Sequence, residues 1–494
     1  MSFFDRKIVT SDTGEETYLT WKETIGYALG KGGQGMSTAI MSSTYVNYFM
    51  TNIFSIPTAV ASRIRLFCGL WDAINDPILG VMVDKTRTKY GKMRPYIKWA
   101  PFISALFTLM FFLGQSSWNY GVKLVFMIVA YVGWDMAYTA VDVPIGALAF
   151  SITPNGIERT KLFGVSAITR AVLGALAGGI VPVALMVPYF KENTAPAYTV
   201  SAIVACAGMI IFTRPAFYWT KERAPYSEDV PGVGESVKLL IQNKPLLMLV
   251  ISNILFTLAT LPAAVRMYFA VDLMGDSKFT LPLEIAAAPA PFLAGILVPI
   301  IAEKMGKRMD FKKFYMRCCV LAAAVHLLLF ATTRGALLGG EGTAGWGLAI
   351  LIIVQLALTL IPLEFKNLCS KEMEAQTVDY IGHKTGHRAE GVMLSVISFT
   401  GKLQNSASSA VALWLLAVSG YATHTDAIPA PQTDSARFAL FAMFTLIPAA
   451  AWLLMLIPMK FYNTKLDGDN NITAEAPPTA LAEREAELER QVQG

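Results

Sequence analysis

The chain has 494 residues, of which 54% are hydrophobic and only 16% are charged, with a formal net charge of +5. Ordinary soluble domains carry roughly 25% charged residues, so this composition excludes a soluble globular protein and indicates that lipid solvates much of the surface. Apolar stretches recur along the sequence and reach about 20 residues, the length that a helix needs to cross the hydrocarbon layer. Backbone amides in lipid must be satisfied within their own segment, so an all-α polytopic membrane protein is predicted.

In chain order, the apolar pattern predicts twelve transmembrane helices in two sets of six. The first set lies near residues 24–50, 53–84, 96–114, 122–150, 162–190 and 197–220. The second set lies near residues 246–271, 281–303, 314–333, 345–368, 391–420 and 437–462. The expected organisation is therefore a polar N-terminal segment 1–23 without the features of a cleaved signal, a six-helix bundle 24–220, a linker 221–245, a second six-helix bundle 246–462 and a tail 463–494.

Lysine and arginine gather in the connections on one side of the predicted bundle. The connection after the second span and the one after the eighth are the densest, with Lys85, Arg87, Lys89, Lys92 and Arg94 in the first and Lys304, Lys307, Arg308, Lys312 and Lys313 in the second. Connections 115–121 and 421–435 carry none. Because cytoplasmic loops retain basic residues, both termini are expected in the cytoplasm and the protein in the plasma (inner) membrane. This asymmetry accounts for the net charge, so no nucleic-acid partner is expected.

The sequence contains no pattern that is typical of an enzyme or a metal centre. It has no HExxH, GxSxG or Walker motif, and His383 and His387 fall in a polar connection. All five cysteines lie in or beside predicted spans, without CxxC spacing or a disulfide framework, so we expect inert core thiols. We expect no enzyme activity, no cofactor, no structural metal and no obligatory protein partner.

The connection between the second and third spans, GVMVDKTRTKYGKMRPY, combines glycine, aspartate and basic residues. Its candidate gating residues are Gly80, Asp84, Lys85, Arg87, Gly91, Lys92 and Arg94. Glycine permits a tight loop and close helix approach. Asp84 at a helix end can form ion pairs that break when the two halves rock. An ordinary positive-inside loop is the alternative, although it would require only the basic residues.

Two carboxylates stand within the second predicted span. Asp72 and Asp76 are one helical turn apart, with Asn75 on the adjoining side. An ionisable side chain at the bilayer centre costs about 2.5 to 3.5 kcal/mol on insertion scales, so it usually faces an interior cavity. Because two such close carboxylates repel each other, at least one is expected to bind a proton or a cation. The pattern predicts a sodium or proton site.

The fourth predicted span carries a second polar stripe. Asp135, Thr139 and Asp142 follow at i, i+4 and i+7, and Tyr138 lies beside them. This face offers hydroxyl and carboxylate groups to a polyol or to the cation. A polar network that only holds helices together is the alternative.

Three of the basic residues inside predicted spans are further candidates for the site. Arg170 lies in the fifth span and Lys402 in the eleventh, so each half contributes a cation that would nearly balance the intramembrane acids. Lys31 belongs to GKGGQG in the first span, a stretch that favours either close packing or a polar backbone lining a cavity. A structural role and a solute contact remain equally open for Lys31.

Three stretches carry a family resemblance: WDAINDPILGVMVDKTRTKYGKMRPY, AYTAVDVPIGALAFSIT and VDYIGHKTGHRAEGVMLSVISFTGKL. With them the chain resembles the glycoside/pentoside/hexuronide:cation symporters of the major facilitator superfamily, which include the melibiose carrier. The resemblance implies a fold of two six-helix bundles and cation-coupled sugar transport. It places Asp72, Asn75, Asp76 and Thr139 at the cation site. It also places Asp142 on the sugar hydroxyls and Lys402 near the cation.

Some positions depart from the melibiose carrier. Gly32 stands where that carrier has an acid, Gly146 replaces its sugar-stacking tryptophan, and Arg170 lies about three residues beyond its arginine. The cation positions therefore match better than the sugar positions, which disfavours galactosides. Hexuronides, pentosides or another polar solute remain open, and Arg170 with Lys402 would suit an anion.

We therefore expect symport of a sugar-like solute with Na⁺ or H⁺ by alternating access, in contact with membrane lipid. The candidate solute-binding residues are Asp142, Tyr138, Asp135, Arg170, Lys31 and Lys402. One alternative is a cation-coupled carrier of a lysolipid or an organic anion. Another is a membrane sensor that transports nothing.

Overall fold

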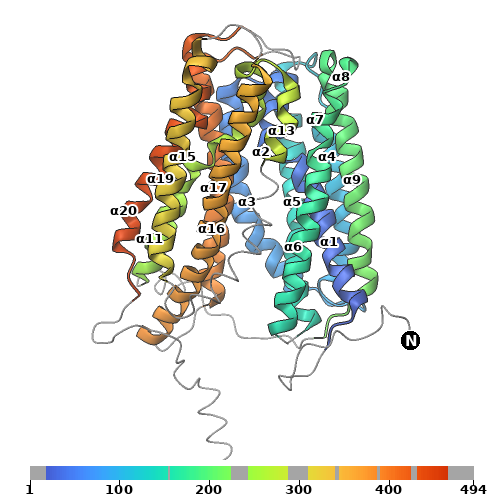
Figure 1. Ribbon diagram of the computed structural model, residues 1–494. Helices are drawn as coiled ribbons and strands as arrows, with labels where there is room; N and C mark the ends of the chain where they lie inside the picture. The colour runs from blue at the N-terminus through green and yellow to red at the C-terminus, as the bar shows by residue number, and fades with distance from the viewer. Residues whose placement is uncertain are drawn as a thin grey trace, which may run out of the picture.

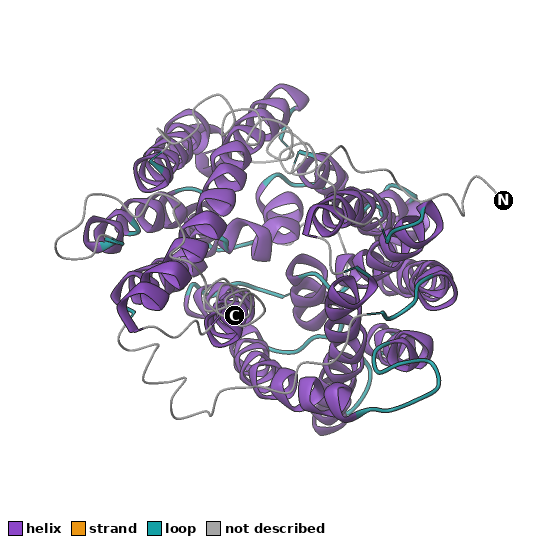
Figure 2. Cartoon of the chain, turned by 90° about the horizontal axis from the view of Figure 1, so that it is seen from below, coloured by secondary structure: helices purple, strands orange, loops and turns teal. Residues whose placement is uncertain are grey.

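The computed structural model describes residues 18–153, 156–223, 243–286, 310–339, 344–385, 390–423 and 431–464. Within these ranges the regular structure is helical, without a β-strand, and eight helices are long and apolar enough to cross a membrane. Seen from below, most helices appear nearly end-on, so they run roughly parallel to one axis (Figure 2). The predicted span 281–303 lies largely outside the described residues, which include only its first turns.

The first half contains the first six predicted spans, with ends shifted by a few residues. Its elements are α1 (Trp21–Ile40), α2 (Ser43–Tyr48), η2 (Phe49–Ile53), α3 (Thr58–Lys85), α4 (Arg94–Phe112), α5 (Tyr120–Ile152), α6 (Gly156–Gly178), α7 (Ile180–Ala184), α8 (Pro188–Glu192) and α9 (Thr194–Trp219). The first predicted span is not one helix, because α1, α2 and the π-helical turn η2 share it.

The second half repeats this plan. Its elements are α11 (Lys244–Ala259), α12 (Leu261–Tyr268), η3 (Phe269–Leu273), η4 (Ser277–Phe279), α13 (Thr280–Ile285), α15 (Phe311–Gly339), α16 (Trp346–Thr385), α17 (Glu390–Val418), α18 (Asp434–Phe444), α19 (Leu446–Leu454) and α20 (Leu456–Phe461). Its last predicted span is divided among α18, α19 and α20.

The two halves stand side by side and meet through α3 and α17. In Figure 1, α1, α4, α5, α6 and α9 form one group, α11, α15, α16, α19 and α20 form the other, and α3 and α17 lie between them. Helix α3 packs along α17 of the opposite half. Gly69 permits this approach, because a Cβ added there would lie 2.2 Å from the Cβ of Ser406. The helix with the predicted cation pair therefore lies against the helix that carries Lys402.

The first membrane helix of each half is broken and ends in the same way. Tyr48 and Phe49 open the π-helical turn η2, and Tyr268 and Phe269 open the equivalent turn η3. Each turn is followed by a residue with positive φ, Ser55 at 58° and Gly275 at 82°. The rings of Tyr48 and Tyr268 contact each other, with centroids 5.1 Å apart. These matching breaks place the two turns together at the junction of the halves.

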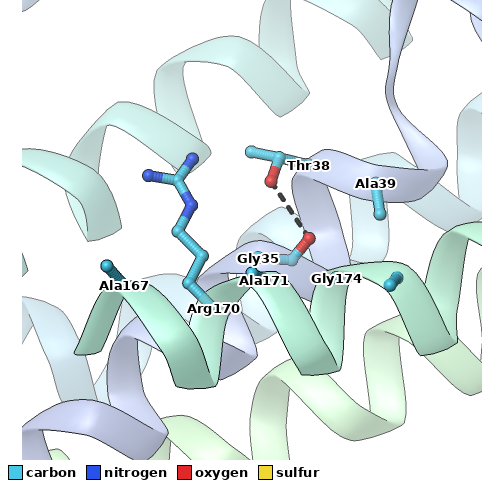
Figure 3. A pocket seen from close by; sticks show the side chains of 8 residues that line it. Gly35, Thr38, Ala39, Ala167, Arg170, Ala171 and Gly174 are labelled. Carbon is cyan, nitrogen blue, oxygen red and sulfur yellow. Dashed lines mark hydrogen bonds between the residues drawn. The ribbon is translucent and has the colours of Figure 1, made fainter. Parts of the chain in front are cut away.

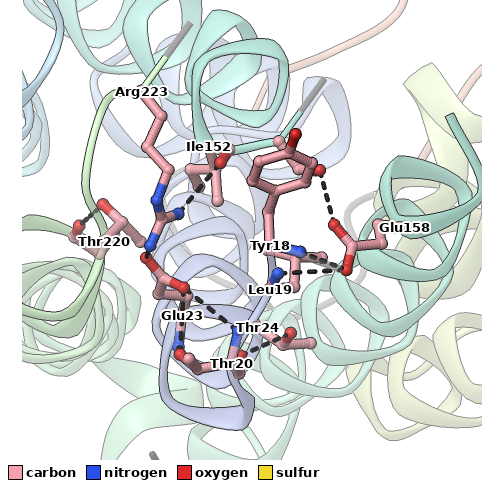
Figure 4. Close-up of polar contacts among 11 residues, drawn as sticks. Tyr18, Leu19, Thr20, Glu23, Thr24, Ile152, Glu158, Thr220 and Arg223 are labelled. Atoms are coloured by element: carbon pink, nitrogen blue, oxygen red, sulfur yellow. Dashed lines mark hydrogen bonds and ion pairs between the residues drawn. The ribbon is translucent and has the colours of Figure 1, made fainter. Parts of the chain in front are cut away.

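The start of α1 is held by charged side chains (Figure 4). Thr20 and Glu23 form a reciprocal capping box. Arg223, just after α9, donates to Glu23 at 2.6 Å, and Glu158 accepts from the amides of Tyr18 and Leu19 at 3.0 and 3.1 Å. These bonds tie α1 to α6 and α9, so the helix that carries Lys31 and Gln34 is fixed relative to its neighbours.

Candidate cation and solute site

Helices α3 and α17 bring two carboxylates and one ammonium group together. Lys402 Nζ lies 3.0 Å from Asp72 Oδ1 and also contacts Asp76 Oδ2. The side chains of Asp72, Asp76 and Lys402 are 17%, 24% and 24% exposed, so they border solvent-accessible space rather than a sealed core. The acids belong to the first half and the lysine to the second, so this ion-pair cluster joins the halves.

Helix α5 completes the polar group around Asp72. Asn75, Thr139 and Asp135 are buried, and Asp135 is near enough to Asp72 for the two carboxyl groups to act on each other electrostatically. Three oxygens lack a hydrogen-bond donor: Asp76 Oδ1, Asp135 Oδ2 and Thr139 Oγ1. Asn75 Nδ2 also lacks a partner. Leaving a buried polar atom unsatisfied costs about 1 to 3 kcal/mol. The three unpartnered oxygens therefore favour binding of a cation or of a hydrogen-bond donor.

Asp135, which the sequence analysis counted among the candidate solute-binding residues, lies near enough to Asp72 to act on it electrostatically. Its solute-binding role stays a prediction. In the described ranges, no three His, Cys, Asp or Glu side chains are arranged as a metal centre. The Lys402 ammonium instead lies between Asp72 and Asp76.

A second polar group joins α1 and α5. Gln34 Nε2 donates to Tyr138 Oη at 2.9 Å and to Asp142 Oδ1. Lys31 Nζ donates to Gln34 Oε1 at 2.9 Å and lies 3.7 Å from Asp142 Oδ1. Lys31 therefore pairs with Asp142 rather than serving only as packing. Asp142 is 33% exposed, so its carboxylate can accept hydrogen bonds from a hydroxyl-bearing solute.

Tyr138 lies between the two groups. Asp72, Asp142 and Arg170 are all near enough to act electrostatically on its hydroxyl. Its ring stacks on Trp134, with centroids 5.3 Å apart and planes inclined by 20°. The cation candidates and the solute candidates are thus neighbours on one face of α5.

Arg170 borders a pocket of about 400 Å³ between α1 and α6 (Figure 3). The other lining residues are small: Gly35, Thr38, Ala39, Ala167, Ala171, Gly174 and Ala175. The Arg170 stem lies across Gly35, where an added Cβ would be 2.8 Å from Arg170 Cγ. The guanidinium extends away from α6.

Arg65 is an interior cation that the sequence analysis missed. It is 4% exposed, lies two helical turns before Asp72, and donates to Ser409 Oγ at 3.0 Å and to the Tyr131 hydroxyl. Its guanidinium carbon is 5.1 Å from the centroid of the Tyr131 ring. An arginine inside an apolar span was the available signal. Because Ser409 belongs to α17, Arg65 also joins the two halves.

The predicted gating loop folds back onto its own half. Gly91 has φ of +101°, and the amides of Lys92, Met93 and Arg94 donate to the Glu222 carboxylate at 2.9 to 3.1 Å. Arg94 also donates to Phe217 O at 2.6 Å. The carboxylate thus caps the start of α4, a role that the sequence analysis did not anticipate.

The other described members of this predicted loop lie at or near the surface of the protein. Lys85 and Arg87 are exposed, and Arg87 donates to the carbonyl of the adjacent Thr86. Gly80 has open space around its Cβ position. The side chain of Asp84 lies outside the described residues, so its predicted ion pairs stay a prediction.

Polar contacts join the two halves at the face where α8 lies, the upper one in Figure 1. Thr51 and Tyr268 share a hydrogen bond of 2.7 Å, and Asn52 donates to Tyr421 Oη at 3.0 Å. At the surface, Lys191 of α8 forms an ion pair of 3.0 Å with Asp276. The halves are therefore bound together at the face opposite the 85–94 loop.

Comparison with known proteins identifies the family. The family model described as "MFS/sugar transport protein" matches residues 26–465. The chain belongs to the glycoside/pentoside/hexuronide:cation symporter family of the major facilitator superfamily. It is 29% identical over 466 residues to the isoprimeverose transporter of Lactiplantibacillus pentosus, and the aligned region covers 90% of this chain and 89% of that protein.

One further relative and one solved structure are similar to this chain. The chain is 25% identical to the glucuronide carrier protein homolog of Escherichia coli K12, over 90% of this chain and 93% of that protein. Its fold is similar to that of the nucleoside transporter NupG (D323A mutant), with a TM-score of 0.62 at 13% identity over 88% of this chain and 99% of that one. As a member of this symporter family, the protein is a multi-pass membrane transporter that carries sugar-like solutes with a cation, and it is not an enzyme.

Proposed function

We propose that the coupling ion, Na⁺ or H⁺, binds at Asp72, Asn75, Asp76 and Thr139, and that Asp135 belongs to the same site. The observation that carries this proposal is the Lys402 ion-pair cluster, in which an ammonium group from the second half contacts two carboxylates of the first. Asp72, Asp76 and Lys402 by themselves leave one negative charge, which a monovalent cation would neutralise, and Asp135 adds a third carboxyl group beside them. The unpartnered oxygens of Asp76, Asp135 and Thr139 supply the ligands that such a cation requires.

Lys402 gives the cation a route to the conformation of the halves. A cation that approaches Asp72 and Asp76 competes with the ammonium group for the same oxygens. Unit charges about 4 Å apart interact by about 4 kcal/mol at an effective dielectric of 20, so the competition is large enough to shift a conformational equilibrium. Cation occupancy is thus linked to the contact between α3 and α17.

The solute binds beside this site, at Asp142, Tyr138, Lys31 and Arg170. A carboxylate next to an ammonium group offers sugar hydroxyls both an acceptor and a donor, and Gln34 holds the pair in place. Because Tyr138 lies near Asp72 as well as Asp142, solute and cation would act on each other through one side chain. The coupling is a free energy shared by both ligands and must be reciprocal.

Alternating access follows from the contacts between the halves. The halves are bound together at the α8 face, whereas Asp142 and Asp76 remain 33% and 24% exposed, which favours entry from the opposite face. That face carries the basic 85–94 loop, so we assign it, with both termini, to the cytoplasm. The protein would reside in the plasma (inner) membrane, in contact with lipid, and it needs no protein partner for this cycle.

The test is solute uptake into proteoliposomes with an imposed sodium or proton gradient. We expect one gradient to drive accumulation of a glycoside, and Asp76→Asn to abolish the accumulation. Asp310→Asn is the matched control, because that aspartate lies at the surface and is 46% exposed. Accumulation that ignores both gradients, or that survives Asp76→Asn unchanged, contradicts the proposed cation site.

A further inference from the structure

Arg170 borders a pocket and has no counterion among the described residues. Lys31 pairs with Asp142, and Lys402 pairs with Asp72 and Asp76. Arg65 is buried among hydroxyl groups. In the described part of the chain, Arg170 has neither a hydrogen bond nor an ion pair, and its side chain is exposed to the pocket. A charge inside a membrane protein ordinarily has a partner, so this guanidinium is available to one that arrives from outside.

The pocket leaves room for that partner. Its wall consists of glycine, alanine and threonine side chains, and the Thr38 hydroxyl is already bonded to Gly35 O at 3.0 Å. The wall therefore offers little competition for a polar group, and the Arg170 fork is the strongest polar feature of the pocket (Figure 3). A guanidinium binds a carboxylate or a sulfonate through two parallel hydrogen bonds.

The pocket adjoins the proposed hydroxyl-binding group. Gln34 points to Tyr138 and Asp142, whereas the next residue, Gly35, lines the Arg170 pocket. Arg170 is also near enough to Lys31 to act on it electrostatically. A solute held at Asp142 by its hydroxyl groups can therefore reach Arg170 with another substituent.

We propose that this substituent is an acidic group and that the preferred solute is a sugar acid or an acidic glycoside rather than a neutral one. Arg170 binds the carboxylate or sulfonate, while Asp142 and Lys31 bind hydroxyl groups. Lys402 takes no part in holding the anion, because two carboxylates already surround its ammonium group. This inference rests on the proposed function and adds the charge of the solute to it.

The test is calorimetric titration of the purified full-length protein with matched pairs of sugars. Each pair consists of an acid and its neutral counterpart: methyl glucuronide with methyl glucoside, and methyl galacturonide with methyl galactoside. We expect wild-type protein to bind at least one acid about tenfold or more tightly than its neutral partner, because the neutral sugar lacks the charge-assisted hydrogen bond to Arg170. Arg170→Gln should abolish this preference by weakening the acid alone, and Arg170→Lys should restore part of it.

The control is Arg214→Gln on α9, whose guanidinium packs on the Phe102 ring away from the pocket. We expect this variant to keep the wild-type preference for the acid. Preference for the neutral sugar, equal binding of both members, or binding of no acid overturns the inference. So does an acid preference that survives Arg170→Gln.

The same titrations, repeated with and without sodium and at two pH values, separate this inference from the proposed function. A cation effect on affinity that Asp76→Asn removes supports symport whichever sugar binds. Tight acid binding that ignores the cation would support the Arg170 site and contradict the cation site.

Discussion

Gly69→Ala tests whether the close approach of α3 and α17 positions the cation cluster. The added Cβ would lie 2.2 Å from Ser406 Cβ and 2.5 Å from Ser406 Oγ. Ordinary van der Waals contact begins near 3.4 Å, so one helix must move by roughly 1 Å, because rotating the serine cannot displace its Cβ. Overpacking of this kind costs about 1 to 3 kcal/mol, of which the better helix propensity of alanine returns up to about 1 kcal/mol.

This displacement should lengthen the contacts between Lys402 and the two acids of α3. We expect Gly69→Ala to lower the thermal unfolding midpoint of the purified protein and to weaken cation-dependent uptake in proteoliposomes. Gly69→Ala combined with Ser406→Gly should recover both, since the clashing Cβ is then absent. Gly335→Ala, in a membrane helix with open space at the glycine, is the matched control. If Gly69→Ala behaves as wild type, or the second substitution recovers neither property, the proposed role of the contact is wrong.

Three further predictions concern other parts of the molecule. Asp135→Asn should raise the sodium or proton concentration for half-maximal uptake by about tenfold or more, because a cation ligand is lost; an unchanged cation dependence with weaker solute binding would return Asp135 to the solute site. Glu222→Gln should lower the unfolding midpoint by more than Asp310→Asn does, since three amides lose a charged acceptor worth about 1.5 to 3 kcal/mol. Burial raises the pKa of Asp276, but hydrogen bonds from the Lys278 amide and from Lys191 lower it by more than burial raises it. Its net pKa is therefore below the usual range. Its pair with Lys191 should therefore persist at neutral pH and break only as the pH falls through that lowered pKa. Asp276→Asn should speed labelling of a cysteine introduced at Ser277. Acidification from pH 8 to 6 should leave the pair of Asp276 with Lys191 intact in the wild type, so any change in labelling over that range arises from other groups.

Most of the helical plan could be predicted because membrane insertion depends on the local apolar content of each segment. Spans such as 96–114 and 122–150 correspond to α4 and α5 with ends shifted by a few residues. The breaks within the first and seventh spans were not predicted. The π-helical turns η2 and η3 face each other across the junction of the halves, and hydropathy carries no signal for such a contact.

The candidate site was predicted unevenly. The family motifs indicated Asp72, Asp76 and Lys402 together, and the structure brings the three into contact. Periodicity on α5 put Asp135 and Asp142 on one stripe, but it could not tell which acid faces α3 and which faces α1. Gln34 contacts Asp142, Glu222 contacts Lys92 and Arg65 contacts Tyr131 across 108, 130 and 66 residues of the chain, so local spacing could not predict these contacts.

The sequence by itself determined that this chain spans the membrane in two related halves and that its interior carries acids suited to a cation. An ionisable residue within an apolar span is energetically costly, so its presence in the sequence already indicates that it faces the interior. Only the tertiary structure decided which charges neutralise one another. Lys31 and Lys402 each have an acid from another helix, whereas Arg170 borders a pocket without one. A Coulomb interaction depends on distance in space, and the packing of α1, α3, α5, α6 and α17 sets those distances.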